Sequence, residues 1–487
     1  MDYYMKLKSM IHQKVETSVL EKELLDHVEL IFSENLIFQY YDLLKKYDFN
    51  DDCVKVMIGW LALLSGDNIS LMRLMQIIDM DQLNRQYQSL FYDLKALTSL
   101  SGSAEDRIKY NDLALDLIKK DKNTFFYANV HLTRGQIHAG LKKYRKAGEY
   151  FYIAYQTFFK VDMMFPASVA VTNAMLNWFK LGEFEKLLNL SQNILLMSSQ
   201  FKSNPSKYWD VVKLPIGMTY AAQLKMKLAE EFLKQSKKTI DDLNLVHMHG
   251  YVELYLMDVY HYNHDGQKLE KIFNDTDKIF NQMNYPFMRV ALIYGKILRG
   301  KTITSSDIQF IEIYYDQAKL TVDPLAFELL QYLSIHESTV NLSLEEIVNH
   351  IKDLRYHGDL INLATSLLLL AEYYARNQQE KEMYLILEEL VDLYEQHHIK
   401  HIFYRYPISI WKQLQSLNSN ITKNISKLDE LTYKEQEIMS YIKEGYTNKD
   451  IAEKLFISIG TVKWHINNIY RKLDVTSRVD AINQIKK

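Results

Sequence analysis

Residues Gly135–Ala154 read GQIHAGLKKYRKAGEYFYIA, and their spacing decides how most of the chain folds. Four positions recur at intervals of three, four and three residues, which places them on one side of a helix: Tyr144, Ala147, Phe151 and Ala154. Gly135 lies nine residues before this set, where a preceding helix needs a small residue for close packing. The stretch therefore predicts two helices that pack against each other across a short turn.

The same spacing returns twice downstream, at Phe184, Leu187, Ser191 and Ile194 and at Met226, Ala229, Leu233 and Ser236. It resembles the tetratricopeptide (TPR) repeat, although the steps of 40 and 42 residues exceed the TPR period of roughly 34. More degenerate units lie around Leu269 and Tyr384, and earlier ones near Ser70 and Ile108. Each helix pair leaves an apolar face that its neighbour must cover, so the pairs should stack. We predict an all-α, TPR-like α-solenoid over residues 1–411, with an irregular all-helical domain as the alternative.

Composition agrees with a folded, helical protein. The chain has 487 residues, 48% of them hydrophobic, with only six prolines and fifteen glycines. Turns between helices are predicted at three polar stretches: SGDN (65–68), SLSGSAED (99–106) and QSKKTIDD (235–242). Cys53 is the one cysteine, which excludes an internal disulfide and a cysteine-based zinc site. We find no export signal and no apolar run of about 18 residues, so we expect a cytoplasmic protein without a membrane segment.

The stretch GKILRGKT, Gly295–Thr302, fits the phosphate-loop expression G-x-x-x-x-G-K-[ST]. A phosphate loop needs small residues so that backbone N–H groups can surround the anion. Lys296, Ile297, Leu298 and Arg299 are bulky instead, and the preceding residues have helical spacing. We therefore interpret the stretch as a helix end and a turn, followed by a helix that Ser305 or Ser306 caps.

Other catalytic and metal-binding patterns do not support an enzyme. His397 and His401 stand one helical turn apart, and His261 and His264 form a second close pair, but no HExxH motif or matched carboxylate accompanies them. A solvated helix face explains these histidines. The chain also lacks a GxSxG motif. We expect no enzymatic activity, no cofactor and no metal.

A Ser- and Asn-rich stretch, predicted as a linker over residues 412–429, precedes a C-terminal domain over residues 430–487. Helix caps divide this domain into four short helices. Thr432 with Glu435 opens the first, which ends near Gly445. Thr447 with Asp450 opens the second, to about Leu455. Ser458 opens the third, to about Leu473, and Ser477 opens the fourth, toward Ile485. The second and third helices, joined by a short turn, predict a helix-turn-helix.

The third predicted helix has two chemically different sides. Val462, Ile466, Ile469 and Leu473 form an apolar stripe that should pack against Ile438, Ile451 and Leu455. The opposite side carries Gly460, Lys463, Trp464, Asn467 and Arg471, which we assign to DNA. Lys463 can reach a guanine edge or a phosphate, Asn467 can pair with adenine, and Trp464 can contact a thymine methyl or the sugar backbone. The predicted phosphate contacts come from Ser458, Thr461, Lys449, Arg471 and Lys472.

Residues 431–485 closely resemble the LuxR-type, also called GerE-type, helix-turn-helix of bacterial transcription regulators. The segments LTYKEQEIM, GYTNKDIAEKL, SIGTVKWHINNIYRKL and SRVDAI follow that family's pattern in order and spacing. The resemblance implies double-stranded DNA binding through the third helix, usually as a dimer in which the fourth helix meets its mate. It also carries base-contact roles onto Lys463, Trp464 and Asn467. Asp474 stands where glycine is usual, so the exit of the third helix can differ in shape.

The whole chain is similar to the C-terminal half of the large LuxR regulators of the maltose-activator type, without their NTPase domain. We therefore predict a bacterial transcription regulator whose repeats sense a small molecule, peptide or protein, with RNA polymerase as a possible partner. Residues 431–487 carry ten Lys and Arg and seven Asp and Glu, a net charge of +3, whereas the chain carries −3. Residues 1–430 therefore carry −6 and should not bind DNA. The alternative is an adaptor that docks a protein through the repeats and the C-terminal helices.

Overall fold

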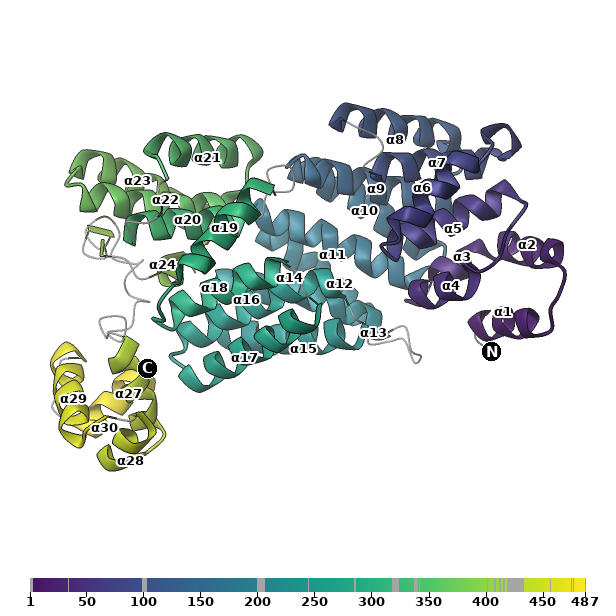
Figure 1. The fold of residues 1–487 in the computed structure, drawn as a ribbon. Coiled ribbons are helices and arrows are strands. Elements are labelled where there is room, and N and C mark those ends of the chain that lie inside the picture. The colour runs from purple at the N-terminus through teal and green to yellow at the C-terminus, as the bar shows by residue number, and fades with distance from the viewer. Residues whose placement is uncertain are drawn as a thin grey trace. The chain divides into compact units, whose positions relative to one another are not determined.

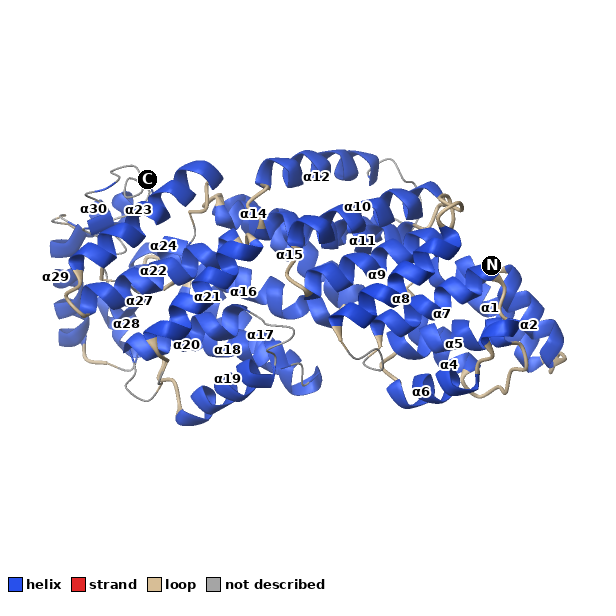
Figure 2. Ribbon diagram, turned by 90° about the horizontal axis from the view of Figure 1, so that it is seen from above, coloured by secondary structure: helices blue, strands red, loops and turns tan. Residues whose placement is uncertain are grey.

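The computed structural model describes the backbone over residues 1–487 except for 1–2, 34, 99–102, 199–205, 244, 284–285, 318–323, 337–339, 341, 401, 407–408, 411–412, 415–416, 418–432, 456, 474, 476 and 487. Within the described residues all regular structure is helical, as Figure 2 shows, so the all-α prediction is confirmed. None of the described helices is long and apolar enough to cross a membrane. The described chain divides into two compact units, Met1–Pro215 and Ile216–Lys487.

The first unit is built from helices that pair with their neighbours in the chain (Figure 1). Its elements are α1 (Tyr3–His12), α2 (Thr17–Asp26), α3 (Val28–Ser33), α4 (Ile37–Leu44), α5 (Asp52–Leu64), α6 (Asn68–Ile77), η1 (Met80–Gln82), α7 (Arg85–Leu97), α8 (Ala104–Ile118), α9 (Phe125–Gly140), α10 (Tyr144–Lys160), α11 (Met164–Lys180), α12 (Phe184–Ser198), α13 (Ser206–Trp209) and η3 (Asp210–Val212). Helix α14 (Lys213–Ala222) spans the boundary between the units.

The second unit continues the same arrangement of helix pairs. Its repeat helices are α15 (Met226–Leu243), α16 (Val246–Tyr262), α17 (Gly266–Met283), α18 (Pro286–Leu298), α19 (Ser305–Gln317), α20 (Pro324–His336), α21 (Leu344–His357), α22 (Leu360–Arg376), α23 (Glu380–His397) and the short α24 (Ile402–Arg405). Four further helices, α27 to α30, complete the unit and are described below. Most of the predicted linker, residues 412–429, lies outside the described residues, so the predicted domain boundaries stay a prediction.

Buried stripes and glycines hold the helices of each pair together, as the repeat spacing predicts. The twelve residues of the three predicted stripes on α10, α12 and α15 are all buried. On α9, a Cβ built at Gly135 would lie only 2.6 Å from the Phe151 ring of α10. On α14, a Cβ at Gly217 would lie 2.7 Å from Leu233 of α15. Each glycine therefore allows the second helix of its own pair to approach the first.

One predicted turn and one predicted helix cap need correction. QSKKTIDD lies inside α15, because Ser236, Thr239 and Ile240 form its buried side, and Thr239 Oγ1 donates to Gln235 O at 3.3 Å. Polar residues with adequate helix propensity therefore continue this helix. The cap of α19 is Thr304, one residue earlier than predicted: Asp307 N donates to Thr304 Oγ1 (3.3 Å), and Thr304 N donates to Asp307 Oδ2 (3.0 Å). The turn at SGDN is confirmed, with Gly66 at φ 78°.

The stretch GKILRGKT forms the end of α18 and a turn, as predicted. Gly295 lies within the helix, where an added Cβ would be 2.9 Å from Met257 and from Phe273. Gly300 ends the helix at φ 60°, and Lys296 pairs with Asp307 at 2.7 Å. The glycines therefore serve helix packing and helix termination.

The buried carboxylate of Asp93 on α7 links this helix to α8 and α9 through hydrogen bonds. It accepts hydrogen bonds from Asn111 Nδ2 (2.9 Å), Asn129 Nδ2 (2.8 Å) and Thr133 Oγ1 (2.8 Å). Asn111 lies 40 residues before Phe151, a distance of one repeat step. The hydrogen bond between Asn111 and Asp93 therefore occupies the position at which the next helix pair has the Phe151 ring. Burial raises the pKa of Asp93 to about 7, and the three hydrogen bonds offset this shift only in part.

Two glycines of α9 provide a matched test of the packing. In Gly135→Ala, the added methyl overlaps the buried Phe151 ring, and we expect a loss of about 1–3 kcal/mol in the free energy of unfolding. In Gly140→Ala, nothing lies within 4 Å of the added methyl, so the better helix propensity of alanine should leave the stability equal or up to about 1 kcal/mol higher. Thermal unfolding followed by circular dichroism measures both. Equal effects of the two changes would contradict the proposed packing.

The raised pKa of Asp93 predicts a pH dependence of stability. Because the folded pKa of about 7 lies above the ordinary value of 3.8, an unfolded chain releases this proton at lower pH than the folded one. The contribution of Asp93 to the free energy of unfolding should decline as the pH rises from about 4 to about 7 and then level off. Urea unfolding of the wild type and of Asp93→Asn over this range measures the difference. A difference that is independent of pH would contradict the shift.

Candidate nucleic-acid interface

The last four helices begin and end where the capping residues predict. They are α27 (Tyr433–Lys443), α28 (Asn448–Leu455), α29 (Ile459–Leu473) and α30 (Arg478–Lys486). Gly445 takes φ 89° after α27. Thr447 and Asp450 form a reciprocal cap on α28, with N–H to side-chain distances of 2.9 and 3.3 Å, and these hydrogen bonds hold the pKa of Asp450 below its ordinary value. Thr432 lies outside the described residues, so its predicted cap stays a prediction.

The caps at the starts of α29 and α30 are also confirmed. Thr461 N donates to Ser458 Oγ at 3.0 Å, and Asp480 N donates to Ser477 Oγ at 3.1 Å. The start of α29 is thereby fixed with respect to the turn after α28. This pair of helices and its turn have the helix-turn-helix arrangement that the sequence predicts.

One side of α29 closes the small core of these four helices. Val462, Ile469 and Leu473 are fully buried, and Ile466 is 6% exposed. They lie in one cluster with the following side chains of the other three helices: Ile438, Met439, Ile442, Ile451, Ala452 and Ala481. Leu455 is partly buried against the same cluster. The predicted apolar stripe and its predicted contacts are therefore both present.

The opposite side of α29 faces solvent. Gly460, Lys463 and Asn467 are exposed, and Trp464 is 62% exposed, which is unusual for a large aromatic side chain. The Trp464 ring meets the ring of His465 edge to face, with centroids 4.9 Å apart. The ammonium group of Lys463, the indole of Trp464 and the carboxamide of Asn467 thus project from one side of α29, within two turns of the helix. These groups can contact phosphates, thymine methyls and adenine edges.

The residues predicted to contact phosphates occupy different settings. Lys449 is exposed in the first turn of α28. Ser458 and Thr461 are exposed, but their hydroxyls hydrogen bond to each other at 2.8 Å, so both already have a capping role. Arg471 and Lys472 lie in the last turn of α29, with side chains outside the described part of the chain. Contacts of these residues with DNA stay a prediction.

Arg478 has a role that the sequence reasoning missed. At the start of α30, its guanidinium donates to the carbonyl oxygens of Tyr446 and of Ile442 (3.4 Å) and to Asn448 Oδ1 (3.4 Å). Arg478 thereby ties α30 to the turn between α27 and α28. Its position gave a signal, because an arginine is unfavourable in the first turn of a helix unless it has a partner elsewhere.

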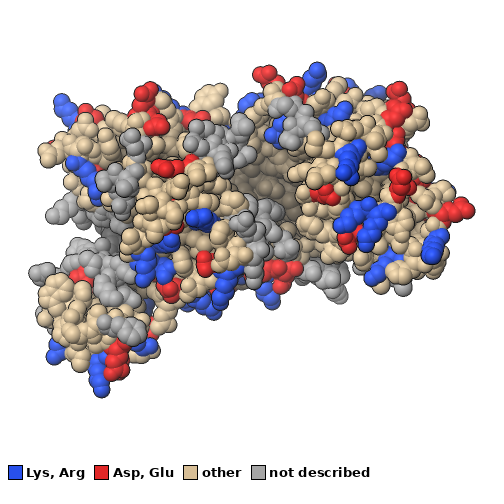
Figure 3. Space-filling model, viewed as in Figure 1, with Lys and Arg blue, Asp and Glu red and all other residues tan. Residues whose placement is uncertain are grey.

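The surface charge of this domain is modest. Among the described residues on the face shown in Figure 3, lysine and arginine side chains lie at the lower edge of the C-terminal helices and do not form one broad basic patch. This distribution agrees with the net charge of +3 over residues 431–487. Nonspecific attraction to DNA should therefore be weak, and a defined set of contacts must contribute much of the affinity.

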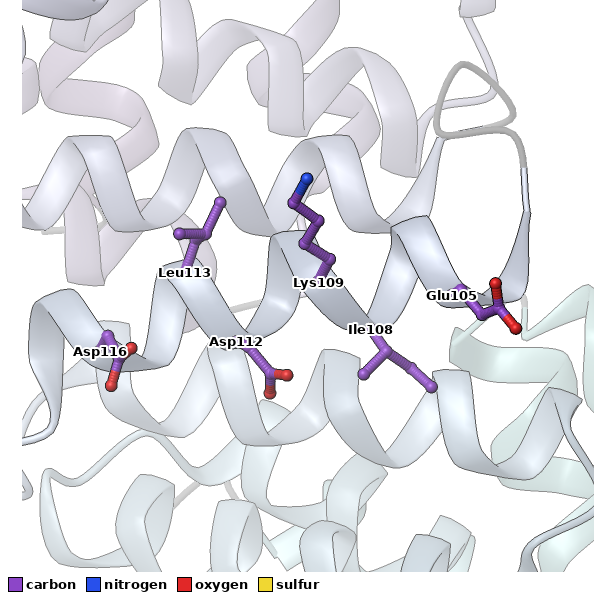
Figure 4. Close-up of a pocket in the computed structure, with 6 residues that line it drawn as sticks. All are labelled: Glu105, Ile108, Lys109, Asp112, Leu113 and Asp116. Carbon is purple, nitrogen blue, oxygen red and sulfur yellow. The ribbon is translucent and has the colours of Figure 1, made fainter.

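A shallow depression lies on the first unit, along α8 (Figure 4). All six residues that line it come from this one helix: Glu105, Ile108, Lys109, Asp112, Leu113 and Asp116. Asp112 is paired with Arg134 of α9 at 2.6 Å. The depression is open and does not enclose a ligand as small-molecule sites usually do.

A pair of substitutions tests which side of α29 is buried. Ile469→Ala removes a fully buried side chain and should cost about 2–5 kcal/mol, which raises amide hydrogen exchange across residues 433–473. Asn467→Ala changes an exposed residue two positions away and should leave this exchange unchanged. Hydrogen exchange with mass spectrometry on the full chain measures both. Equal loss of protection in the two variants would contradict the assignment.

Comparisons with known proteins agree with this geometry. Residues 429–484 match the family described as "Bacterial regulatory proteins, luxR family". Three relatives share this region: "Transcriptional regulatory protein LiaR" of Bacillus subtilis (57% identical over 53 residues), "Transcriptional regulatory protein LnrK" of the same organism (47% over 70) and "Response regulator protein VraR" of Staphylococcus aureus (38% over 69). The matches cover 11%, 14% and 14% of this chain and 25%, 31% and 33% of the relatives.

The family match therefore concerns the C-terminal helices. Within that region, the described residues form four helices in the helix-turn-helix arrangement. Helices α27 to α30 therefore form a helix-turn-helix DNA-binding domain of the luxR family, which matches residues 429–484.

Proposed function

We propose that this chain is a bacterial transcription regulator that binds operator DNA through α29. The observation that carries the proposal is the two-sided character of α29 within a luxR-family domain. The apolar side of α29 is buried in the core of the domain. Only the side with Lys463, Trp464 and Asn467 is therefore exposed to a partner. The major groove of DNA admits an α-helix of this width.

Each exposed group has a distinct task in this proposal. Asn467 can make two hydrogen bonds to adenine, and Lys463 can donate to guanine or to a phosphate. Trp464 supplies apolar contact to a thymine methyl. Lys449 and the first N–H groups of α29, which have no partner inside the helix, position the backbone phosphates, with Arg471 and Lys472 adding charge.

The wider proposal concerns the partners and the setting. We expect two copies to bind one operator, with α30 meeting its mate, because the net charge of +3 is small for a monomeric DNA binder. The repeats would sense a small molecule, peptide or protein, and RNA polymerase would be contacted at promoters. The protein would act in the cytoplasm, without a catalytic step or a cofactor.

Selection of bound sequences from random DNA, followed by gel shifts at several salt concentrations, tests the proposal. Asn467→Ala should lose about 1–3 kcal/mol of discrimination at one base pair. Lys463→Ala should lower either the discrimination or, if it contacts a phosphate, the log–log salt slope by about 1.

Lys443→Ala is the matched control, because it removes one exposed positive charge from the same domain outside α29. Its operator affinity should change less than that of Lys463→Ala. Selective DNA binding that survives both changes in α29 would refute the assigned interface. Absence of any selective binding, together with capture of a protein by the repeats, would favour the adaptor function instead.

A further inference from the structure

The segment that follows α23 runs across one helix of each of five successive repeat pairs. Most of its described residues are buried, among them Ile399, Phe403, Arg405, Tyr406 and Leu414, whereas Ser409 is exposed. Four of its described residues form the short helix α24, and Gln413 and Leu414 are also helical. Figure 1 shows α24 between α18 on one side and α20 and α22 on the other. We call residues 399–414 the internal segment.

The contacts of the internal segment follow the order of the repeats. Lys400 N donates to Ala222 O, at the end of α14 (2.8 Å). Arg405 reaches Asp258 of α16 and Glu328 of α20, while its backbone oxygen accepts from Tyr294 of α18 (3.4 Å).

Aromatic and carboxylate groups of the repeat helices make further contacts with the internal segment. The Tyr406 ring stacks on Tyr332 of α20, with centroids 4.8 Å apart, and meets Tyr294 edge to face. Ser409 donates its N–H (2.8 Å) and its hydroxyl (2.9 Å) to Glu372 of α22. We call the face made by α14, α16, α18, α20 and α22 the acidic groove. It contacts both the main chain and the side chains of the internal segment, and repeat proteins use such concave faces to bind partners.

The charges in the acidic groove are only partly matched by the internal segment. Asp258 and Glu328 are both buried and share one cation, Arg405. The nitrogen–oxygen distances are 3.8 and 3.4 Å, longer than the 2.7–2.9 Å of a good charge-assisted hydrogen bond. Among the described residues, Asp258 Oδ2, Glu328 Oε1 and Arg405 Nε have no hydrogen-bond partner.

Another ligand could satisfy these hydrogen-bonding groups more completely than the internal segment does. Burial raises the pKa of both carboxyls, because Arg405 and, at Asp258, the hydrogen bond from the Tyr294 hydroxyl offset the loss of water only in part. A guanidinium placed for two parallel hydrogen bonds, or a second cation, would satisfy the groups that the internal segment leaves unsatisfied. The internal segment keeps its place because it is tethered, which gives it a high effective concentration.

We propose that the acidic groove is a binding site for a peptide that carries an arginine flanked by aromatic residues, and that the internal segment is a displaceable internal ligand of this site. Arg405 and Tyr406 supply the same chemistry within the chain. Displacement frees the segment that leads to α27, so the peptide would alter how the luxR-family domain meets DNA. This last consequence rests on the proposed function, whereas peptide binding does not.

A labelled peptide with the sequence of residues 399–410, IKHIFYRYPISI, tests the proposal by fluorescence anisotropy with the full chain. Arg405→Ala removes the internal anchor and leaves the groove carboxylates in place, so it should bind the peptide about 10-fold tighter than the wild type, or more. Adding Asp258→Asn and Glu328→Gln to this variant should abolish the gain. A peptide with alanine in place of its arginine should bind none of these proteins measurably.

Hydrogen exchange on the wild type provides a readout that does not depend on how the variants fold. Saturating peptide should raise amide exchange in residues 399–414, and the alanine peptide should leave it unchanged. The proposal is overturned if the peptide leaves this exchange unchanged in the wild type and binds Arg405→Ala no tighter than the wild type. It is also overturned if binding is insensitive to the carboxylate changes. Because no DNA is present, these outcomes are independent of the DNA-binding test.

Discussion

Each helix of this chain has a side that cannot face water, and covering that side is the constraint on which the structure depends. In the repeat units the cover comes from the partner helix, which approaches closely where Gly135 and Gly217 remove a side chain. In the C-terminal domain the cover for α29 comes from α27, α28 and α30. Because burial uses one side of α29 completely, its polar side is left for a partner. The same physical requirement thus builds the array and determines which side of α29 we propose to contact DNA.

Local patterns in the sequence predicted the parts of the structure that depend on local interactions. Caps such as Thr447 with Asp450, and Ser458, predicted the helix starts, and the three-four-three spacing identified the buried stripes. QSKKTIDD was predicted wrongly as a turn because most of its residues are polar. In the structure it is helical, and Ser236, Thr239 and Ile240 form its buried side. Thr239 can lie in the helix interface because its hydroxyl bonds to the carbonyl oxygen of Gln235 in the preceding turn.

Long-range contacts could not be predicted in this way. Arg405 lies 147 residues from Asp258 and 77 residues from Glu328, and no local pattern indicates that these charges meet. The contact of Arg478 with the carbonyl oxygens of the α27–α28 turn was missed for the same reason. In both cases a buried or partly buried arginine ties a later segment to helices formed earlier in the chain. Such ties set the geometry of a site, whereas spacing predicts only which residues share a helix face.

The most direct measurement of the central claim is photo-crosslinking from α29 to operator DNA. Cys53, the only cysteine of the chain, is buried, so a photoreactive label can be confined to a thiol introduced by Asn467→Cys or, as a control, by Lys443→Cys. We predict crosslinks to bases of the selected site from Asn467→Cys and none to bases from Lys443→Cys. If the labelled Asn467→Cys protein retarded the same DNA but formed no crosslink to it, α29 would not be the helix that reads the sequence.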